Sequence, residues 1–390
     1  MGTDGRESGA RADERAPNGE ATSIHAGRPG TEDGDVAERL AERVREAASS
    51  GAPIAIGGAG TKRTLGHDGV GEPLSTLAHS GIVNHEPTEL VLTARAGTPI
   101  ATLVASLAEA RQMLPFEPPD GGGTLGGVVA CGLSGPRRPY AGAVRDFVLG
   151  TRVVNGHGQV LRFGGEVMKN VAGYDVSRVQ VGAHGTLGLL LEVSMKVLPM
   201  PESELTLHHR LDEPDVADTL VALARRPLPL SASLVHGPDR YVRLSGSAVA
   251  VEAAVRELGG TRVPDEQAPW ESVRERRHPF FDGERPLWRL AVPEHAPPIA
   301  LPGDWLLDWG GAQRWLRSEA PAADVFAAAA AAGGHATRYR RVLADGTPEA
   351  VDGPLFQPLE GALRRLHARL RDSFDPQRIL NRGRYHPELD

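Results

Sequence analysis

The apolar positions in the first half of the chain follow two different periods. Helical spacing of apolar residues over 36–48 and 100–111 predicts two amphipathic helices, and we expect Thr98 to cap the second one. Short apolar runs at 53–56 and 90–94 predict buried strands. Three further strands are expected, over 147–154, 159–163 and the stretch from Gly188 to Leu198. The first two of these form a hairpin, because the Asn-Gly pair between them supplies the positive φ angles of a tight turn.

Pro199 and Pro201 end this pattern and mark a predicted domain boundary. Beyond them, strands and helices alternate irregularly, which predicts a small α+β unit. Its expected strands are 204–211, 230–235, 241–244 and 305–309, and its expected helices follow Pro214 and span 248–258 and 322–332. A helix over 359–374 precedes the tail. Residues 1–34 lack hydrophobic periodicity, so we expect this segment to be disordered.

Length, charge and cysteine content limit the possible functions. A chain of 390 residues exceeds the usual size of one domain, so two domains sharing one wall are expected. The formal net charge of -7 argues against binding to DNA or RNA, which needs a basic surface to displace counterions. Since Cys131 is the only cysteine, a disulfide framework is excluded, and any iron–sulfur cluster would have to lie on a partner protein.

The location of the protein is also predicted from its apolar runs. None of them approaches the ~18 residues that a membrane span requires, and the N-terminus lacks a hydrophobic signal core. We therefore expect a cytoplasmic protein, with membrane association only at the periphery and through partners.

Three glycine-rich loops carry the candidate chemistry. Each follows or opens a predicted strand, and dense glycine exposes backbone N–H groups to an anion such as a pyrophosphate. None is a Rossmann fingerprint, since the third has the wrong spacing and precedes a strand, and there is no Walker motif. Three such loops predict an extended ligand that carries phosphate. They run over 57–62, 119–127 and 182–188, with sequences GGAGTK, PDGGGTLGG and GAHGTLG.

These loops, together with Arg145-Asp146-Phe147-Val148-Leu149-Gly150 and Val171-Ala172-Gly173-Tyr174-Asp175, resemble the FAD-binding domain of the vanillyl-alcohol oxidase type. Within that superfamily, the segment from Met168 to Arg178 and the ending Phe374-Asp375-Pro376 with Asn381 and Gly383 resemble the FAD-binding E subunits of bacterial glycolate oxidases. The resemblance is strong over residues 50–200 and in the tail.

The resemblance implies an α+β fold. A disordered segment, residues 1–34, would precede an FAD-binding domain of two subdomains, residues 35–202. A small α+β cap domain for the substrate would follow over 203–354. Residues 355–390 would then return to the FAD-binding domain as a helix and tail.

The same resemblance implies the cofactor-binding residues. Gly57, Gly58, Gly60 and Thr61 would wrap the pyrophosphate of FAD, and the second loop would follow the diphosphate and ribityl chain through Gly121, Gly122, Gly123, Thr124, Gly126 and Gly127. The third loop would flank the flavin through Gly182, Gly185, Thr186 and Gly188. Further candidates for the cofactor site are Ala59, Lys62, Pro119, Ser134, Arg145 and Asp146.

Two departures from the family pattern matter. Ala59 stands in the first loop, where many relatives carry a histidine bonded to the flavin, so FAD is expected to be non-covalent. Arg382 stands where relatives usually have a proline, which bears on how the last loop covers the flavin. No metal site is expected.

Several side chains have two interpretations. Arg138 and Arg145 could hold a phosphate or a carboxylate, whereas Arg145 beside Asp146 is also consistent with a structural ion pair. Lys169 and Tyr174 are either flavin neighbours or ordinary surface and core residues.

For the other polar and aromatic candidates the structural interpretation is favoured. His184 is either a general base or a satisfied loop residue, and Cys131 is expected to be a small core residue. The neighbours His208 and His209 would point to opposite faces of a strand and cannot chelate one metal together. Trp305 and Trp309 are expected to pack the second domain. No catalytic residue is assigned.

The resemblance implies oxidation of glycolate, or of D-lactate, to the 2-oxo acid within a complex. The partners would be a larger flavoprotein subunit and an iron–sulfur subunit that receives the electrons. Two alternatives stay open: a free-standing FAD-dependent oxidoreductase for another hydroxy acid or alcohol, and a non-catalytic structural subunit.

Overall fold

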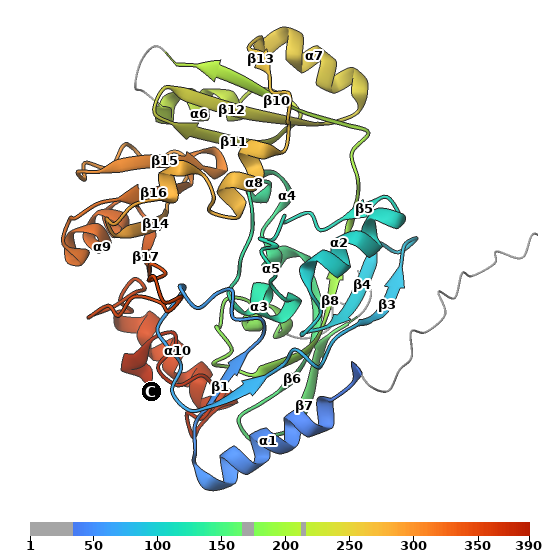
Figure 1. Cartoon of the computed structure of the whole chain (residues 1–390), viewed down its shortest axis with the longest axis vertical. Helices are drawn as coiled ribbons and strands as arrows, with labels where there is room; N and C mark the ends of the chain where they lie inside the picture. Colours follow the sequence, from blue (N-terminus) through green and yellow to red (C-terminus); the bar gives the residue numbers. More distant parts are fainter. Residues whose placement is uncertain (1–33, 166–174, 212–215) are drawn as a thin grey trace, which may run out of the picture. The chain divides into compact units, whose positions relative to one another are not determined.

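The computed structural model describes residues 34–165, 175–211 and 216–390, which form two antiparallel sheets with helices packed against them (Figure 1). The first sheet has five strands in the order β3-β4-β8-β6-β7. These strands are β3 (Ile82–Glu86), β4 (Val91–Arg95), β6 (Val148–Val154), β7 (Val160–Gly164) and β8 (Leu189–Lys196). Two short strands, β1 (Ile54–Gly57) and β2 (Glu72–Ser75), pair in parallel beside it.

The central strand β8 separates two hydrophobic clusters. Leu189 and Leu191 pack with helix α1 (Ala37–Ser50) on one face, whereas Leu190 and Val193 belong to the main core on the other face. Neighbouring side chains of a strand point to opposite faces, and the register between β8 and β6 shifts between Leu190 and Glu192, so Leu191 and Val193 reach different clusters. The apolar residues of this strand are therefore buried on both of its faces.

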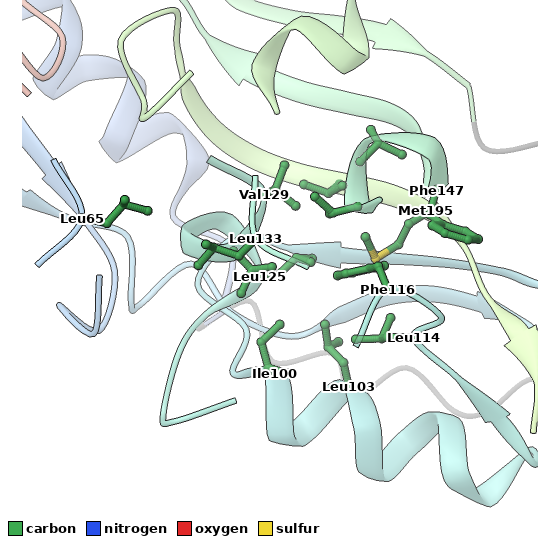
Figure 2. Close-up of a cluster of buried hydrophobic side chains, with 14 of the residues drawn as sticks. Leu65, Ile100, Leu103, Leu114, Phe116, Leu125, Val129, Leu133, Phe147 and Met195 are labelled. Atoms are coloured by element: carbon green, nitrogen blue, oxygen red, sulfur yellow. The ribbon is translucent and has the colours of Figure 1, made fainter. Parts of the chain in front are cut away.

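The main core lies under helices α2 (Ile100–Glu109) and α3 (Leu125–Ala130). Ile100 and Leu103 of α2 point toward Leu125 of α3, and Phe116 lies near Met195 of β8 (Figure 2). Phe116 and Phe147 also contact each other, with ring centroids 6.1 Å apart. This core fixes the start of α3, which forms one wall of the site described below.

One helix cap differs from the prediction. The N-cap residue of α2 is Pro99, which offers no side-chain cap. The hydroxyl of Thr98 instead donates to the carbonyl of Arg95 (2.7 Å) and accepts from the N–H of Gly81 (2.9 Å). The prediction that Thr98 caps this helix is therefore wrong, because the side chain stabilises the neighbouring turn.

The second sheet has eight antiparallel strands in the order β13-β10-β12-β11-β15-β16-β14-β17. They are β10 (Ser203–Arg210), β11 (Leu230–His236), β12 (Asp239–Gly246), β13 (Thr261–Arg262), β14 (Leu287–Ala291), β15 (Asp304–Asp308), β16 (Gln313–Arg317) and β17 (His335–Tyr339). Its helices are α6 (Val216–Ala224), α7 (Ala248–Leu258), α8 (Ala268–Arg274) and α9 (Ala322–Ala331).

One face of this sheet carries two helix-covered clusters, around Leu207 with α7 and around Trp288 with α9. Other sheet residues, including Leu234, Leu306 and Trp315, belong to the main core together with residues of the first sheet. Trp309 is buried and Trp305 packs against the α9 cluster, as expected.

A buried charge network joins the second sheet to the segment around the second glycine loop. The guanidinium of Arg243, on β12, lies 2.7 Å from the carboxylate of Glu117, which precedes the second glycine loop. Arg137 contacts both Glu117 and Glu204 of β10. Arg243 and Arg137 are almost fully buried, and each has a carboxylate partner, as buried charges require.

The C-terminal part returns to the first sheet. After helix α10 (Gly361–Phe374), the chain runs beside β1: the N–H of Ile54 donates to the carbonyl of Ile379 (2.8 Å), and the N–H of Asn381 donates to the carbonyl of Ile54 (3.0 Å). Asp375, fully buried, accepts from the N–H groups of Ile379 and Leu380. The tail is thereby fixed next to the first glycine loop.

The short elements that complete the described chain connect the larger ones. Strand β5 pairs with β9, and α4 and α5 lie between the second glycine loop and β6. Their bounds are β5 (Gln112–Met113), β9 (Leu198–Pro199), α4 (Arg138–Ala141) and α5 (Val144–Phe147). The domain limits at 34/35, 202/203 and 354/355 stay predictions, and the expectation for residues 1–34 lies outside the described residues apart from Gly34.

Candidate functional site

The three glycine loops meet around one cleft. The space inside it that water-sized molecules can occupy is about 150 Å³. The first loop contributes residues 57–62, the second Thr124, Gly126 and Gly127, and the third Gly185 and Gly188. The cleft is also lined by residues that were not predicted, namely Ile56, Arg63, Thr76, Ala96, Ala130, Cys131, His184, Leu190, Asn381 and Arg384.

The first loop follows β1 directly and lies against the second. A methyl group at Gly58 would lie 2.5 Å from the hydroxyl oxygen of Thr124, a distance that no real contact allows. At Gly57 the same methyl group would meet nothing within 4 Å. The close packing of the first loop on the second therefore requires glycine at position 58. The lack of a side chain at Gly57 instead leaves open space in the cleft.

The second loop ends where α3 begins. Thr124 is the N-cap residue of this helix, and its hydroxyl accepts from the N–H of Gly127 at 3.3 Å. Gly126 packs so closely on Ala96 that a methyl group there would lie 2.8 Å from the Ala96 side chain. Two of the predicted glycines are therefore explained by close packing of the backbone around the cleft.

His184 occupies the third loop in a left-handed conformation, with φ of 54°. Its backbone N–H donates to the carbonyl of Ala130 (2.8 Å), which ties the third loop to α3. The ring is buried, stacks on Tyr385 with centroids 4.7 Å apart, and leaves Nδ1 without a hydrogen-bond partner. Burial, together with the nearby Arg384 and Arg289, lowers the pKa of His184 to about 3, so the ring is neutral.

Asn381 connects the first and third loops. Its side-chain oxygen accepts from the N–H of Ile56 (2.6 Å), and its side-chain nitrogen donates to the carbonyl of His184 (2.7 Å). Asn381 itself is buried and has a φ of 44°, a conformation that asparagine tolerates better than most residues. Asn381 is one of the residues that carry the family resemblance, but it was not predicted as a site residue.

Cationic side chains give the cleft a positive potential. The guanidinium of Arg384 donates to the carbonyls of Lys62, Leu65 and His67, which fixes the segment after the first loop. Lys62 donates to the hydroxyl of Thr61 at 2.9 Å. Burial, and then the charge of Arg276, lowers the pKa of Lys62. A desolvated cation of this kind is stabilised when an anion binds beside it.

The residues of the cleft fit FAD. The loops leave backbone space that side chains would fill, three cations (Lys62, Arg63 and Arg384) line the wall, and His184, which also lines the cleft, has an unpartnered ring nitrogen. A diphosphate needs the open backbone and the cations, and the polar edge of a flavin can form a hydrogen bond with the ring nitrogen of His184. Cys131 also faces the cleft while packing against the main core, and burial raises the pKa of its thiol.

Some predicted site residues lie outside this cleft. Pro119 and Ser134 line a separate cavity of about 30 Å³, and the hydroxyl of Ser134 accepts from the N–H of Val144. Gly121 lies beside the carboxylate of Glu275, whose other oxygen accepts from the N–H of Asp120. Gly122 and Gly123 lie close to Thr61 and Lys62, at the edge of the first loop.

Arg145, Gly182 and Thr186 line a different groove, on the side of the third loop away from the cleft. Among the described residues Asp146 has no ion pair with Arg145; its carboxylate accepts from the N–H of Ala143 at 2.8 Å instead. The interpretation of these two side chains as a structural ion pair is therefore wrong. Arg138 lies over the ring of Trp309, 4.3 Å from its centroid.

The remaining polar candidates are explained locally. His208 and His209 follow each other on β10 and have separate partners, the carboxylate of Asp239 and the carbonyl of Leu258. This agrees with their predicted opposite orientation. Lys169 and Tyr174 lie outside the described residues, as do most residues of the segment from Met168 to Arg178.

No helix within residues 34–165, 175–211 and 216–390 is both long and apolar enough to cross a membrane.

Comparisons with known proteins agree with the geometry of the cleft. Residues 35–164 match the family model of an FAD binding domain. The chain is 46% identical over 357 residues to glycolate oxidase subunit GlcE of Escherichia coli (strain K12), which covers 91% of this chain and 99% of that protein.

Two other similarities are narrower. Glycolate oxidase subunit GlcD of Bacillus subtilis (strain 168) is 35% identical over 133 residues, which are 33% of this chain and 28% of that protein. Among solved structures, an alkyldihydroxyacetonephosphate synthase superposes with a TM-score of 0.61 at 14% identity, covering 88% of this chain and 74% of that one. This last similarity shows the shared α+β fold.

Proposed function

Because the chain belongs to the family of glycolate oxidase subunit GlcE, we propose that it is the FAD-binding subunit of a heteromeric complex that oxidises glycolate to glyoxylate. The observation that carries this proposal is the convergence of three glycine loops on one cleft inside an FAD-binding domain. The further partners would be a larger flavoprotein subunit and an iron–sulfur subunit. The complex would lie in the cytoplasm.

The residues of the cleft divide into three groups by what they would do. Gly57, Gly58, Gly60 and Thr61 would hold the pyrophosphate of FAD, with Lys62 and Arg384 balancing its charge. Gly126, Gly127, Gly185 and Gly188 would let the rest of the cofactor approach the backbone. Ala59 offers no nucleophile, so FAD would be bound without a covalent link.

When bound, FAD supplies two-electron oxidation of the carbon that carries the hydroxyl group of a 2-hydroxy acid. His184 is a weak base in this site, since its pKa is about 3. It would therefore accept or donate a hydrogen bond as a neutral ring. The wall formed by the buried His184 and Leu190 together with Ala130 would exclude water from the cofactor.

One experiment tests the proposal. The full chain is purified alone and after co-expression with the larger flavoprotein and the iron–sulfur subunit, and each flavin spectrum is recorded before and after adding glycolate without oxygen. We expect the chain alone to carry FAD that glycolate does not bleach, and the complex to be bleached. Acid precipitation of the chain should release all of its FAD into the supernatant.

Two results would contradict this proposal in different ways. Bleaching of the isolated chain by a hydroxy acid or alcohol would indicate a free-standing oxidoreductase. A colourless chain that takes up no FAD would indicate a non-catalytic structural subunit.

A further inference from the structure

A second, larger depression lies behind the third glycine loop. Its free space is about 360 Å³, and it runs between that loop and helix α10. Val179 and Leu187 form one side, and Leu366 and Leu370 of α10 form the other. We call this depression, with the exposed leucines next to it, the α10 groove.

Helix α10 exposes an apolar stripe beside this groove. Leu363 is 51% exposed and Leu366 is 46% exposed, and Leu370 continues the same helical face toward the groove. Arg371 is the only residue of the helix that is buried. Such a stripe on a helix normally packs against another element, so this face is without its partner in the chain as described.

Unpaired arginines border the stripe. At helical spacing Arg369 lies next to Leu366, and Arg145 lines the opposite wall of the groove. Neither has an ion pair among residues 34–165, 175–211 and 216–390. Among the other exposed arginines some are paired, such as Arg43 with Glu46 and Glu72 and Arg262 with Glu252, whereas others, such as Arg39 and Arg256, have no ion pair within the described ranges. What distinguishes this face is that two such arginines border an exposed apolar stripe, in a chain whose net charge is -7.

The groove shares a wall with the cofactor cleft. Tyr385 lines the groove, and its ring stacks on the ring of His184, which lines the cleft. Gly182 and Thr186 face the groove, while Gly185 and Gly188 of the same loop face the cleft. A protein seated in the groove would therefore lie two aromatic rings away from the cofactor.

We propose that the α10 groove is the docking site for the larger flavoprotein subunit. The occupant would be a segment of that subunit with apolar side chains that cover the leucine stripe and with Asp or Glu that pair with Arg145 and Arg369. This inference rests on the proposed function for the existence of the complex. The choice of this face rests on the leucines, the unpaired arginines and the wall shared with the cleft.

The test uses full-length chain co-expressed with the larger flavoprotein subunit and measures the dissociation constant of the purified complex. The variants are Leu366→Glu and the pair Arg145→Glu with Arg369→Glu. Their matched controls lie on helix α7: Val249→Glu, at a position 80% exposed, and Arg256→Glu. We expect each groove variant to weaken the complex at least tenfold, and both controls to leave it within twofold.

Two further measurements separate docking from a folding defect. The FAD content of each variant, read from its absorbance, should equal that of the unchanged chain. The variant with Arg145→Lys and Arg369→Lys should keep the affinity, because it keeps both charges, and added salt should weaken the complex of the unchanged chain more than that of the Glu variant.

Several outcomes would overturn the inference. Unchanged affinity in the groove variants would place the interface elsewhere, although a stable complex would still support the proposed function. Cross-links from the groove to a second copy of the chain, or to its own residues 166–174, would assign another occupant. If the unchanged chain forms no complex with the larger flavoprotein subunit, both proposals fail.

Discussion

Gly58 is the residue whose small size the structure explains most directly. In Gly58→Ala the new methyl group would lie 2.5 Å from the Thr124 hydroxyl, so the first loop must move away from the second. We expect the dissociation constant of FAD to rise about tenfold or more, which is about 1.4 kcal/mol of binding free energy for each factor of ten. Titration of the apoprotein with FAD, followed by fluorescence, measures this change.

Two other glycines serve as references for that prediction. Gly57→Ala adds a methyl group with no protein atom within 4 Å, so it should weaken FAD binding without lowering the thermal stability of the apoprotein. Gly246→Ala meets only an ordinary contact with Pro229, far from the loops in sequence, and should change neither quantity. Equal FAD affinity in all three variants would show that the loops do not hold the cofactor.

His184 gives a prediction about pH. Its folded pKa is about 3, whereas an unfolded histidine has a pKa near 6.5. Between these values the unfolded state binds a proton that the folded state does not, so the free energy of unfolding falls as the pH falls from about 6.5 toward 3. We expect this slope to be steeper in the unchanged chain than in His184→Asn, by up to about 1.4 kcal/mol per pH unit. Urea unfolding of the apoprotein between pH 6.5 and 4.5 measures both slopes.

Asp308 has the opposite effect on the pH dependence of stability, and it is present in both chains of that comparison. Burial raises the pKa of Asp308 to about 7, so it contributes stability that is lost as the pH rises from about 3.8 to about 7. Its contribution cancels when the unchanged chain and His184→Asn are compared. Identical slopes would mean that the His184 ring is solvated and titrates as it does in the unfolded chain.

The tail segment after α10 stabilises the site through the side chain of Asn381. In Asn381→Ala the N–H of Ile56 and the carbonyl of His184 both lose their side-chain partner inside the protein. Because a buried group left without a hydrogen bond costs about 1–3 kcal/mol, we expect the free energy of unfolding to fall by about 2–3 kcal/mol. Urea unfolding measures this loss, and FAD affinity should fall with it.

A polar residue on an exposed strand provides the comparison. Asn84 of β3 is exposed, and Asn84→Ala should change stability by less than about 0.5 kcal/mol. If Asn381→Ala is as mild as that, the tail does not connect the first and third loops in solution.

Elements with local signals were predicted well from the sequence. The apolar run before the first glycine loop is β1, the Asn-Gly hairpin is formed by β6 and β7, and α7 spans the predicted residues. In each case the signal, a hydrophobic period or a turn pair, lies within the element itself. The first and third glycine loops adjoin β1 and β8 as expected, whereas the second loop opens helix α3 and does not adjoin a strand.

Elements and site residues that depend on distant partners were missed. Strand β16 is buried at every position although it contains Gln313, Arg314 and Arg317. Arg314 is satisfied by the carbonyls of Gly311 and Pro297, and Arg317 by that of Phe280, which no local pattern reveals. Asn381 is likewise 325 residues away from the Ile56 N–H that it binds. Tertiary contacts, rather than propensity, decide such positions.

At the scale of the whole molecule, the buried network around Arg243 holds the second sheet against the segment around the second glycine loop. Arg243→Met leaves Glu117 with a single cation, Arg137, in a largely buried place. We expect a loss of about 3 kcal/mol or more in the free energy of unfolding, since removal of one partner leaves a buried charge uncompensated. Adding Glu117→Gln to Arg243→Met should recover part of that loss. Chemical unfolding of the single and double variants measures both the loss and the recovery of the free energy of unfolding.

An exposed pair shows what the same change costs without burial. Arg262 and Glu252 are each about half exposed, and Arg262→Met should cost less than about 1 kcal/mol. A loss of similar size for Arg243→Met would mean that water reaches the network around Arg243.

The return of the tail to β1 also sets an order of events during synthesis. Ile54 bonds to Ile379 and Asn381, and Arg384 fixes the backbone after the first glycine loop, so the pocket wall is complete only after residue 384 has been translated. A nascent chain in which residues 379–384 are not yet free to fold thus has an unfinished binding site. A stop codon placed just before residue 381 should yield a protein without its yellow colour.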